Sequence, residues 1–110
     1  MLDLKGRVAV VTGGASGIGA ACATALEREG AQAVRWDVAE GNSIVGCDVA
    51  DAQSVAAAMK QTRERFGSPT LLVAAAGIPG GSNPIVDMDI AVWDRVLSVN
   101  LRGVEREIAC

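Results

Sequence analysis

Short apolar runs alternate with longer amphipathic segments along most of the chain. The apolar runs predict strands at about residues 7–11, 32–36, 44–47 and 70–74. Helices are predicted at about residues 17–29, after Asp51 and after Asp89. This alternation of strands and helices is typical of a parallel sheet with helices packed on its faces.

The first predicted helix carries apolar residues at spacings of three and four. We expect this stripe to face the sheet, and its members are Ile18, Ala21, Cys22, Ala25 and Leu26. Glu27 to Glu29 are expected to stay in solvent, and Gly30 stands where a helix C-terminus is expected.

The later elements are predicted from caps and from the same periodicity. Asp51 is placed to accept from the N–H of Gln53 or Ser54, with the inner face of its helix formed by Val55, Met59, Thr62 and Phe66. Because residues 70–74 are almost wholly apolar, we expect that strand to be buried on both faces. Residues 78–84 are expected to be irregular and mobile, and Asp89 caps a third helix with Val92, Val96 and Val99 on one side.

The turn after the first strand, Thr12-Gly-Gly-Ala-Ser-Gly-Ile-Gly19, is rich in glycine. Without Cβ atoms at Gly13, Gly17 and Gly19, the backbone can take positive φ and a pyrophosphate can come close to the peptide N–H groups. The free N–H groups of the following helix point at the same place. The sequence therefore predicts a dinucleotide site here.

Composition and charge narrow the choice of partners. The chain has 110 residues, half of them apolar, which suits one domain or part of one. Ten basic and thirteen acidic residues give a net charge of −3 without a basic cluster, so neither nucleic acid nor a membrane surface is an expected partner. The apolar runs are of strand length and the N-terminus lacks a signal-peptide pattern, so we expect a cytoplasmic protein.

The cysteine and histidine counts exclude several chemistries. Cys22, Cys47 and Cys110 show no metal-binding spacing and are expected to be reduced structural thiols. The chain has no histidine, so it cannot build a Ser-His-Asp triad, a Cys-His pair or a histidine metal site from its own residues. No metal is expected.

Four features in the right order make the chain resemble the short-chain dehydrogenase/reductase family. They are Thr12-Gly-x-x-x-Gly-x-Gly19, Asp48-Val49, Ala76-Gly77 and Asn100. The resemblance implies a Rossmann-like, doubly wound parallel α/β sheet, of which residues 1–110 form the NAD(P)-binding N-terminal half with strands in the order 3-2-1-4. We expect this sheet to be incomplete. The family commonly has asparagine where this chain has Ala74.

Asp37 indicates which dinucleotide is bound. It lies eighteen positions after Gly19, where a carboxylate at the end of the second strand can accept from both adenosine ribose hydroxyls. It would repel a 2′-phosphate, and neither Ser16 nor Val38 is basic, so NAD is favoured over NADP. A turn-forming role for Asp37 is the alternative, and Arg35 could pair with Asp37 or with a phosphate.

The resemblance assigns roles to further residues. Asp48 would bind the adenine amino group, Val49 would donate its backbone N–H, and Gly77 would let its loop lie against the nicotinamide ribose. Asn100 matches the family's catalytic asparagine, whose backbone helps hold a water for proton relay. The alternatives are a turn-forming Asp48 and an Asn100 that only interrupts or ends a helix. Cofactor contacts are also expected at Ser16, Ile18, Val38, Ala75 and Ala76.

The family's serine, tyrosine and lysine lie beyond Asn100, whereas this chain has no tyrosine. The resemblance implies an NAD-dependent oxidoreductase acting on an alcohol or ketone, such as a hydroxyacyl-CoA or hydroxysteroid, and a homo-oligomer. The chain alone would be inactive and truncated before the Tyr-x-x-x-Lys region, and the charged residues 105–107 suggest a truncation, a frame change or a partial sequence.

Two alternative hypotheses assign the chain to other functional classes. One is a non-catalytic dinucleotide-binding or interaction module with the same fold. The other is an adenosylmethionine-dependent methyltransferase, which the spacing from Thr12 to Gly19 and the presence of Asn100 disfavour. A P-loop nucleotidase is excluded because no Gly-Lys-Ser/Thr follows the turn.

Overall fold

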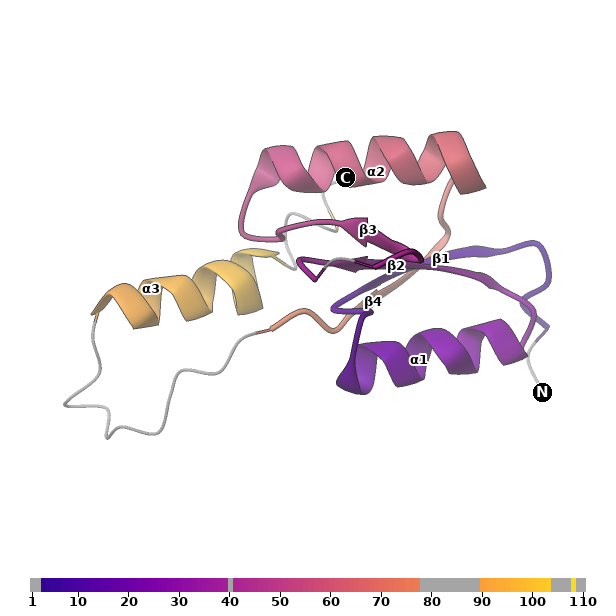
Figure 1. The fold of residues 1–110 in the computed structure, drawn as a ribbon, viewed down its shortest axis with the longest axis horizontal. Helices are drawn as coiled ribbons and strands as arrows, with labels where there is room; N and C mark the ends of the chain where they lie inside the picture. The colour runs from indigo at the N-terminus through magenta and orange to yellow at the C-terminus, as the bar shows by residue number, and fades with distance from the viewer. Residues whose placement is uncertain (1–2, 40, 78–89, 104–107, 109–110) are drawn as a thin grey trace.

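A computed structural model describes residues 3–39, 41–77, 90–103 and 108. A helix follows β1 and another follows β3, whereas β2 and β3 are consecutive strands, and two helical segments follow the fourth strand (Figure 1). In chain order the elements are β1 (Val8–Thr12), α1 (Gly17–Arg28), β2 (Gln32–Asp37), β3 (Ile44–Gly46), α2 (Ala52–Phe66), β4 (Leu71–Ala74), α3 (Ile90–Leu97) and the π-helical segment η2 (Ser98–Arg102).

The four strands form one parallel sheet in the order β3-β2-β1-β4, as predicted. β1 is central, and Val10 pairs in register with Val34 on one side and Leu72 on the other. α1 covers one face of the sheet and α2 covers the opposite face (Figure 1). The carboxyl ends of all four strands therefore meet at one edge of the sheet, where the α/β folds bind ligands.

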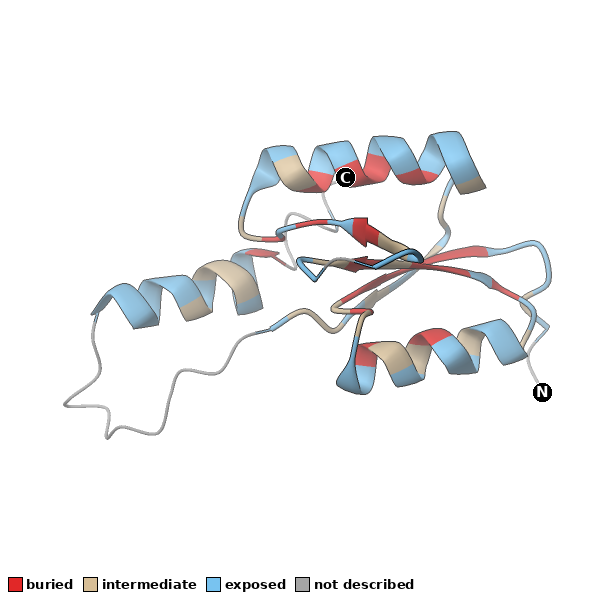
Figure 2. Ribbon diagram, viewed as in Figure 1, coloured by how far each residue is buried: buried red, intermediate tan, exposed pale blue. Residues whose placement is uncertain are grey.

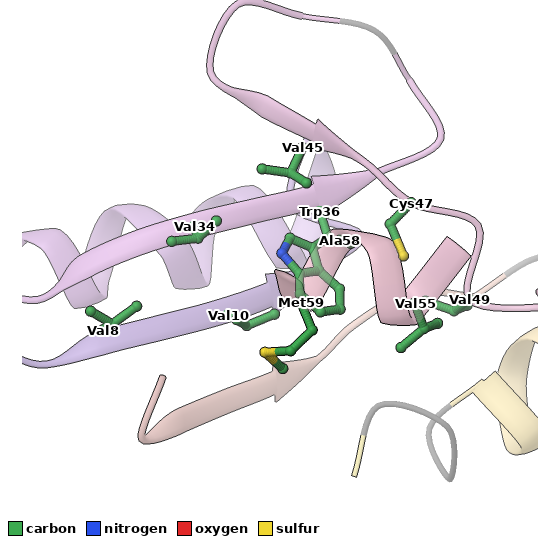
Figure 3. Close-up of a cluster of buried hydrophobic side chains, with 10 residues drawn as sticks. All are labelled: Val8, Val10, Val34, Trp36, Val45, Cys47, Val49, Val55, Ala58 and Met59. Carbon is green, nitrogen blue, oxygen red and sulfur yellow. The ribbon is translucent and has the colours of Figure 1, made fainter. Parts of the chain in front are cut away.

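The larger part of the core lies between the sheet and α2. Val10, Val34 and Trp36 from the sheet pack with Val55 and Met59 from α2 (Figure 3). Each such buried aliphatic side chain stabilises the fold by about 1.5–3 kcal/mol. Figure 2 shows buried residues on the side of α2 that faces the sheet and exposed residues on its outer side.

Trp36 carries the polar group of this core. Its ring is 1% exposed, and Nε1 donates to Thr62 Oγ1 at 3.0 Å. Thr62 Oγ1 in turn donates to the Ala58 carbonyl oxygen at 2.8 Å. This short chain of hydrogen bonds fixes α2 to β2 without leaving the indole N–H unpaired.

The predicted inner face of α1 is wrong in part. Gly19 and Ala23 are the buried residues of this helix, with Cys22 and Leu26 partly buried. Ile18 is 79% exposed, and Ala21 and Ala25 are exposed as well. The reason is that the two small residues, one turn apart, let the helix approach the sheet closely, and this close approach outweighs the larger apolar area of Ile18.

α2 follows the prediction closely. The Asp51 carboxylate accepts from the Gln53 N–H at 3.0 Å and caps the helix. Val55, Met59 and Thr62 are buried, Phe66 packs partly against the core, and Ala58 is a further buried residue.

β4 does not fit the prediction of a strand buried on both faces. Leu72 is 41% exposed and Ala74 is exposed. Among the described strands, β4 pairs only with β1 and forms an edge of the sheet. An apolar composition predicts burial only if a neighbour is present, and within the described residues no element covers this side.

α3 begins at Ile90 and passes directly into η2. Val96 and Val99 are partly buried, whereas Val92 is 38% exposed. The predicted cap Asp89 and the segment 78–84 lie outside the described residues. Of the helices in the described ranges, none has the length and apolar character needed to cross a membrane.

Candidate cofactor site

A pocket of about 510 Å³ opens at the carboxyl ends of the strands. Its volume is within the range usual for small-molecule and cofactor sites. All of the predicted cofactor contacts except Gly17 line it. The lining residues are Gly13, Ser16, Ile18, Gly19, Trp36, Asp37, Val38, Cys47, Asp48, Val49, Ala75, Ala76, Gly77, Arg95 and Val99.

The glycine turn forms one wall because its residues leave no room for side chains. A Cβ on Gly19 would lie 2.0 Å from the Gly13 carbonyl oxygen, and one on Gly13 would lie 2.8 Å from the Ala75 carbonyl oxygen. Gly13 and Gly17 have φ of +65° and +60°, which disfavours other residues. The turn therefore presents bare backbone next to the N-terminus of α1, as the sequence predicts.

Thr12 joins this turn to the loop after β4. Its side chain is fully buried, and Oγ1 accepts from the N–H groups of Ala75 and Ala76 at 3.2 and 3.3 Å. These two hydrogen bonds place residues 75–77 against the glycine turn. Thr12 belongs to the predicted motif, but the sequence alone does not reveal this bridging role.

Asp37 lies at the end of β2, beside the turn. Its Oδ2 accepts from the Ala15 N–H at 3.0 Å and its Oδ1 from the Ala39 N–H at 3.1 Å. The Asp37 carboxylate thus makes turn-forming hydrogen bonds and also lies on the pocket wall. A carboxylate oxygen can accept more than one hydrogen bond, so these contacts leave acceptor capacity for a ligand.

Arg35 pairs with neither Asp37 nor a group in this pocket, contrary to one expectation. Its guanidinium lies 3.6 Å from Glu27 Oε1 and also donates to the Gly14 carbonyl oxygen and to Thr24 Oγ1, each at 3.4 Å. Both side-chain partners belong to α1, so the long side chain extends along that helix. It stabilises the interface between α1 and β2.

Asp48 and Val49 follow β3 on the next part of the wall. The Asp48 N–H donates to Ser54 Oγ at 2.9 Å, and Asp48 Oδ1 accepts from the Ala50 N–H at 3.0 Å. Val49 is buried, and a Cβ added to Gly103 would lie 2.8 Å from Val49 Cγ2. The end of η2 therefore closes tightly over this strand end.

Asn100 does not line the pocket but lies directly beside it. A Cβ on Gly77 would lie 3.2 Å from Asn100 Oδ1, so the absence of a side chain at Gly77 makes room for the amide. Asn100 lies within η2, and π-helical segments occur often at functional sites. The structure thus brings together two residues of the predicted site that are far apart in the sequence.

Four of the residues that line the pocket are not predicted from the sequence. Trp36 and Cys47 each precede a predicted acidic residue at a strand end, which is the signal that could have found them. Arg95 and Val99 are four residues apart and so lie on one side of the helical segment before Asn100. Arg95 places a positive charge in a pocket that also holds Asp37 and Asp48.

Among the described residues, no group of three or more His, Cys, Asp and Glu side chains could hold a metal ion. The chemistry of the pocket is that of backbone N–H groups, two carboxylates and one guanidinium.

Comparison with known proteins identifies the family. A sequence profile described as short chain dehydrogenase matches residues 7–106, which is most of the chain. This chain belongs to the short-chain dehydrogenase family. Its fold is accordingly the Rossmann-like fold of that family.

Curated relatives in this family are dehydrogenases with different substrates. The chain is 46% identical to cis-4-hydroxycyclohexanecarboxylate dehydrogenase of Sinomonas cyclohexanicum, over 89% of this chain and 45% of that protein. It is 34% identical to 2-dehydro-3-deoxy-L-rhamnonate dehydrogenase (NAD(+)) of a Sphingomonas species, over 90% of this chain and 44% of that protein. The chain spans less than half the length of these relatives.

Solved structures of this family have the same arrangement. The 3-ketoacyl-(acyl-carrier-protein) reductase of Brucella melitensis, crystallised with NADH, matches with a TM-score of 0.91 and 29% identity. The match covers 96% of this chain and 49% of that structure. The short-chain dehydrogenase family is one of oxidoreductases that bind a nicotinamide dinucleotide, and this chain corresponds to about half of such a protein.

Proposed function

We propose that this chain binds NAD(H) in the pocket at the carboxyl edge of the sheet. The observation that carries the proposal is the position of Asp37, a carboxylate on the pocket wall whose Oδ2 is 3.0 Å from a backbone nitrogen of the glycine turn. One adenosine diphosphate carries ribose hydroxyls that a carboxylate can bind and a pyrophosphate that a glycine turn can bind, so a carboxylate beside such a turn suits it. A cytoplasmic setting is part of the proposal.

The pyrophosphate would lie against the glycine turn and the N-terminus of α1. The bare backbone there admits the close approach of an anion, and the helix dipole favours negative charge. The contacts proposed for this part of the cofactor are Gly13, Ser16, Gly17, Ile18 and Gly19.

The adenosine would lie along the ends of β2 and β3. Asp37 would accept from the ribose hydroxyls beside Val38, and Asp48 and Val49 would bind the adenine. A 2′-phosphate near Asp37 would be repelled by about 4 kcal/mol for one charge pair at 4 Å and an effective dielectric constant of 20. NAD is therefore proposed over NADP.

The nicotinamide half would lie toward Ala75, Ala76 and Gly77. A bound nicotinamide supplies the hydride acceptor or donor for an alcohol or ketone. Asn100, beside Gly77, would help position a water for proton relay in the whole enzyme.

The whole enzyme is proposed to act on a small alcohol or ketone. Relatives named for a hydroxycyclohexanecarboxylate and a deoxy-rhamnonate support such a substrate, and a hydroxyacyl-CoA or hydroxysteroid is the alternative. Because the chain has neither tyrosine nor histidine, we expect it to bind cofactor without turnover by itself. Alcohol-dependent formation of NADH by the purified chain would contradict that expectation.

Replacing the Asp37 charge tests the cofactor assignment. Asp37→Asn should raise the Kd for NADH about ten- to a hundredfold, because a charge-assisted hydrogen bond to the ribose contributes about 1.5–3 kcal/mol. The measurement is a fluorescence titration of NADH into each purified chain. Asp51→Asn is the matched control, since Asp51 caps α2 without lining the pocket and Asn caps a helix equally well.

Equal NADH affinity in the wild-type and Asp37→Asn chains would remove the ribose role from Asp37. A loss of affinity in Asp51→Asn as large as that in Asp37→Asn would show that the effect comes from net charge rather than from a ribose contact.

We also propose that the chain self-associates through the exposed side of β4. Leu72 lines a hollow of about 320 Å³ with Val10, Met59 and Ile108, beside the strand that forms an edge of the sheet in the described residues. This surface also favours the alternative of an interaction module without catalysis. Light scattering should give a mass above that of one chain for wild type and the mass of a single chain for Leu72→Lys, and a monomeric wild type would contradict the proposal.

A further inference from the structure

The end of β2 holds the glycine turn through successive contacts. The Gly14 N–H donates to the Trp36 carbonyl oxygen at 3.1 Å, and the Ala15 N–H donates to Asp37 Oδ2 at 3.0 Å. The Gly14 carbonyl oxygen accepts from the Arg35 guanidinium at 3.4 Å. Asp37 is the member of this set that reaches Ala15, which lies in the middle of the turn.

The turn needs such support because little else in it is fixed by side chains. Gly13 and Gly17 flank it with positive φ, and glycine loses more conformational freedom on ordering than other residues. Ser16 at the N-cap of α1 makes no side-chain capping hydrogen bond. Any contact that orders the turn before a ligand arrives lowers the entropy that binding must overcome.

The carboxylate of Asp37 has opposite effects on a diphosphate in the turn. Its negative charge repels the phosphates, whereas its hydrogen bond to Ala15 holds the backbone that would receive them. Its second oxygen accepts from the Ala39 N–H at 3.1 Å, which orients the carboxylate toward the turn. The two effects can be separated by a ligand that lacks the ribose hydroxyls.

We propose that Asp37 is a positioning residue for the glycine turn, in addition to its ribose contact. This inference rests on the proposed function and extends it. Asp37 accepts the hydrogen bond from the Ala15 N–H and so holds the turn in the shape that receives the pyrophosphate. This effect does not require a ribose hydroxyl on the ligand. The substitution of Asp37 then weakens both parts of the site and cannot by itself exchange NAD for NADP.

The experiment compares ADP with 2′,3′-dideoxy-ADP, which has no ribose hydroxyls for Asp37 to bind. Calorimetric titration of both ligands is made with the wild-type, Asp37→Ala and Asp37→Asn chains. Loss of the carboxylate charge alone would tighten the binding of dideoxy-ADP to Asp37→Ala. Loss of the hydrogen bond to Ala15 should instead weaken it about three- to tenfold, so the direction of the change decides.

Asp37→Asn provides the rescue. Its amide oxygen can still accept from the Ala15 N–H without the negative charge, although its NH2 group cannot accept from the Ala39 N–H, so this chain should bind dideoxy-ADP more tightly than Asp37→Ala does. If Asp37→Ala binds dideoxy-ADP as tightly as wild type or more tightly, the positioning role is overturned while the proposed function stands. If the wild-type chain binds neither ADP nor NADH, both are overturned.

A measurement on the wild-type chain keeps the proposal testable should Asp37→Ala not fold. Hydrogen exchange followed by NMR should show the Ala15 amide protected in the absence of nucleotide, because it donates to Asp37. Exchange of this amide at the rate of an unstructured peptide would overturn the proposal.

Discussion

Gly19 has the closest backbone approach of any glycine in the described residues. A Cβ there would lie 2.0 Å from the Gly13 carbonyl oxygen, an atom that cannot rotate away as a side chain could. The overlap would be relieved only if the backbone of the turn or the start of α1 moved. Gly19 thus couples the shape of the turn to the packing of the helix.

Gly19→Ala should therefore lower the free energy of unfolding by about 1–3 kcal/mol and weaken NADH binding at the same time. Gly46→Ala is the matched control, since a Cβ at Gly46 meets nothing within 4 Å and should change stability by no more than about 0.5 kcal/mol. Denaturant unfolding and NADH titration of both variants measure the two effects. Unchanged stability and affinity in Gly19→Ala would contradict the close approach of Gly19 and Gly13.

At the scale of elements, the junction of β2 with α2 supports the pocket from behind. Trp36 both lines the pocket and donates its indole N–H to Thr62 at 3.0 Å on α2. The residue that follows Trp36 is Asp37. The packing of α2 therefore fixes the strand end from which the proposed ribose contact is made.

Thr62→Val should leave the buried indole N–H of Trp36 without an acceptor and lower the free energy of unfolding by about 1–3 kcal/mol. Thr62→Ser keeps the hydroxyl and serves as the control. NMR exchange of the indole N–H should be slow in wild type and Thr62→Ser and faster in Thr62→Val, and Trp93, which is 48% exposed, gives an internal reference. Equally slow exchange of the Trp36 indole in Thr62→Val would contradict this role.

Local signals in the sequence predict most of the elements and the strand order. The Asp51 cap and the apolar face of α2 were predicted correctly because they depend on neighbours within one helix. The face of α1 was predicted wrongly, since apolar area favours Ile18 while close approach to the sheet requires Gly19 and Ala23. Periodicity measures hydrophobicity and does not measure the distance between a helix and a sheet.

In the whole molecule, the sequence predicts the pocket residues at the strand ends better than it predicts those that come from α3 and η2. The residues at the strand ends follow from the topology, because parallel strands place their carboxyl ends together. Arg95 and Val99 could not be predicted, since their place depends on how α3 and η2 meet the sheet. In Figure 1, α3 extends from the sheet at the end where the strands finish.

The exposure of β4 was likewise beyond prediction, because it depends on which elements lie beside the strand. Leu72 has the composition of a buried strand residue and is 41% exposed.

A paired calorimetric titration of the wild-type chain with NADH and NADPH shows whether the pocket holds NAD and whether Asp37 selects it. We predict binding of one NADH per chain, on the order of tenfold or more tighter than NADPH at the same ionic strength, because the Asp37 carboxylate repels a 2′-phosphate. NADPH binding as tight as or tighter than NADH, or no binding of either, would contradict the account.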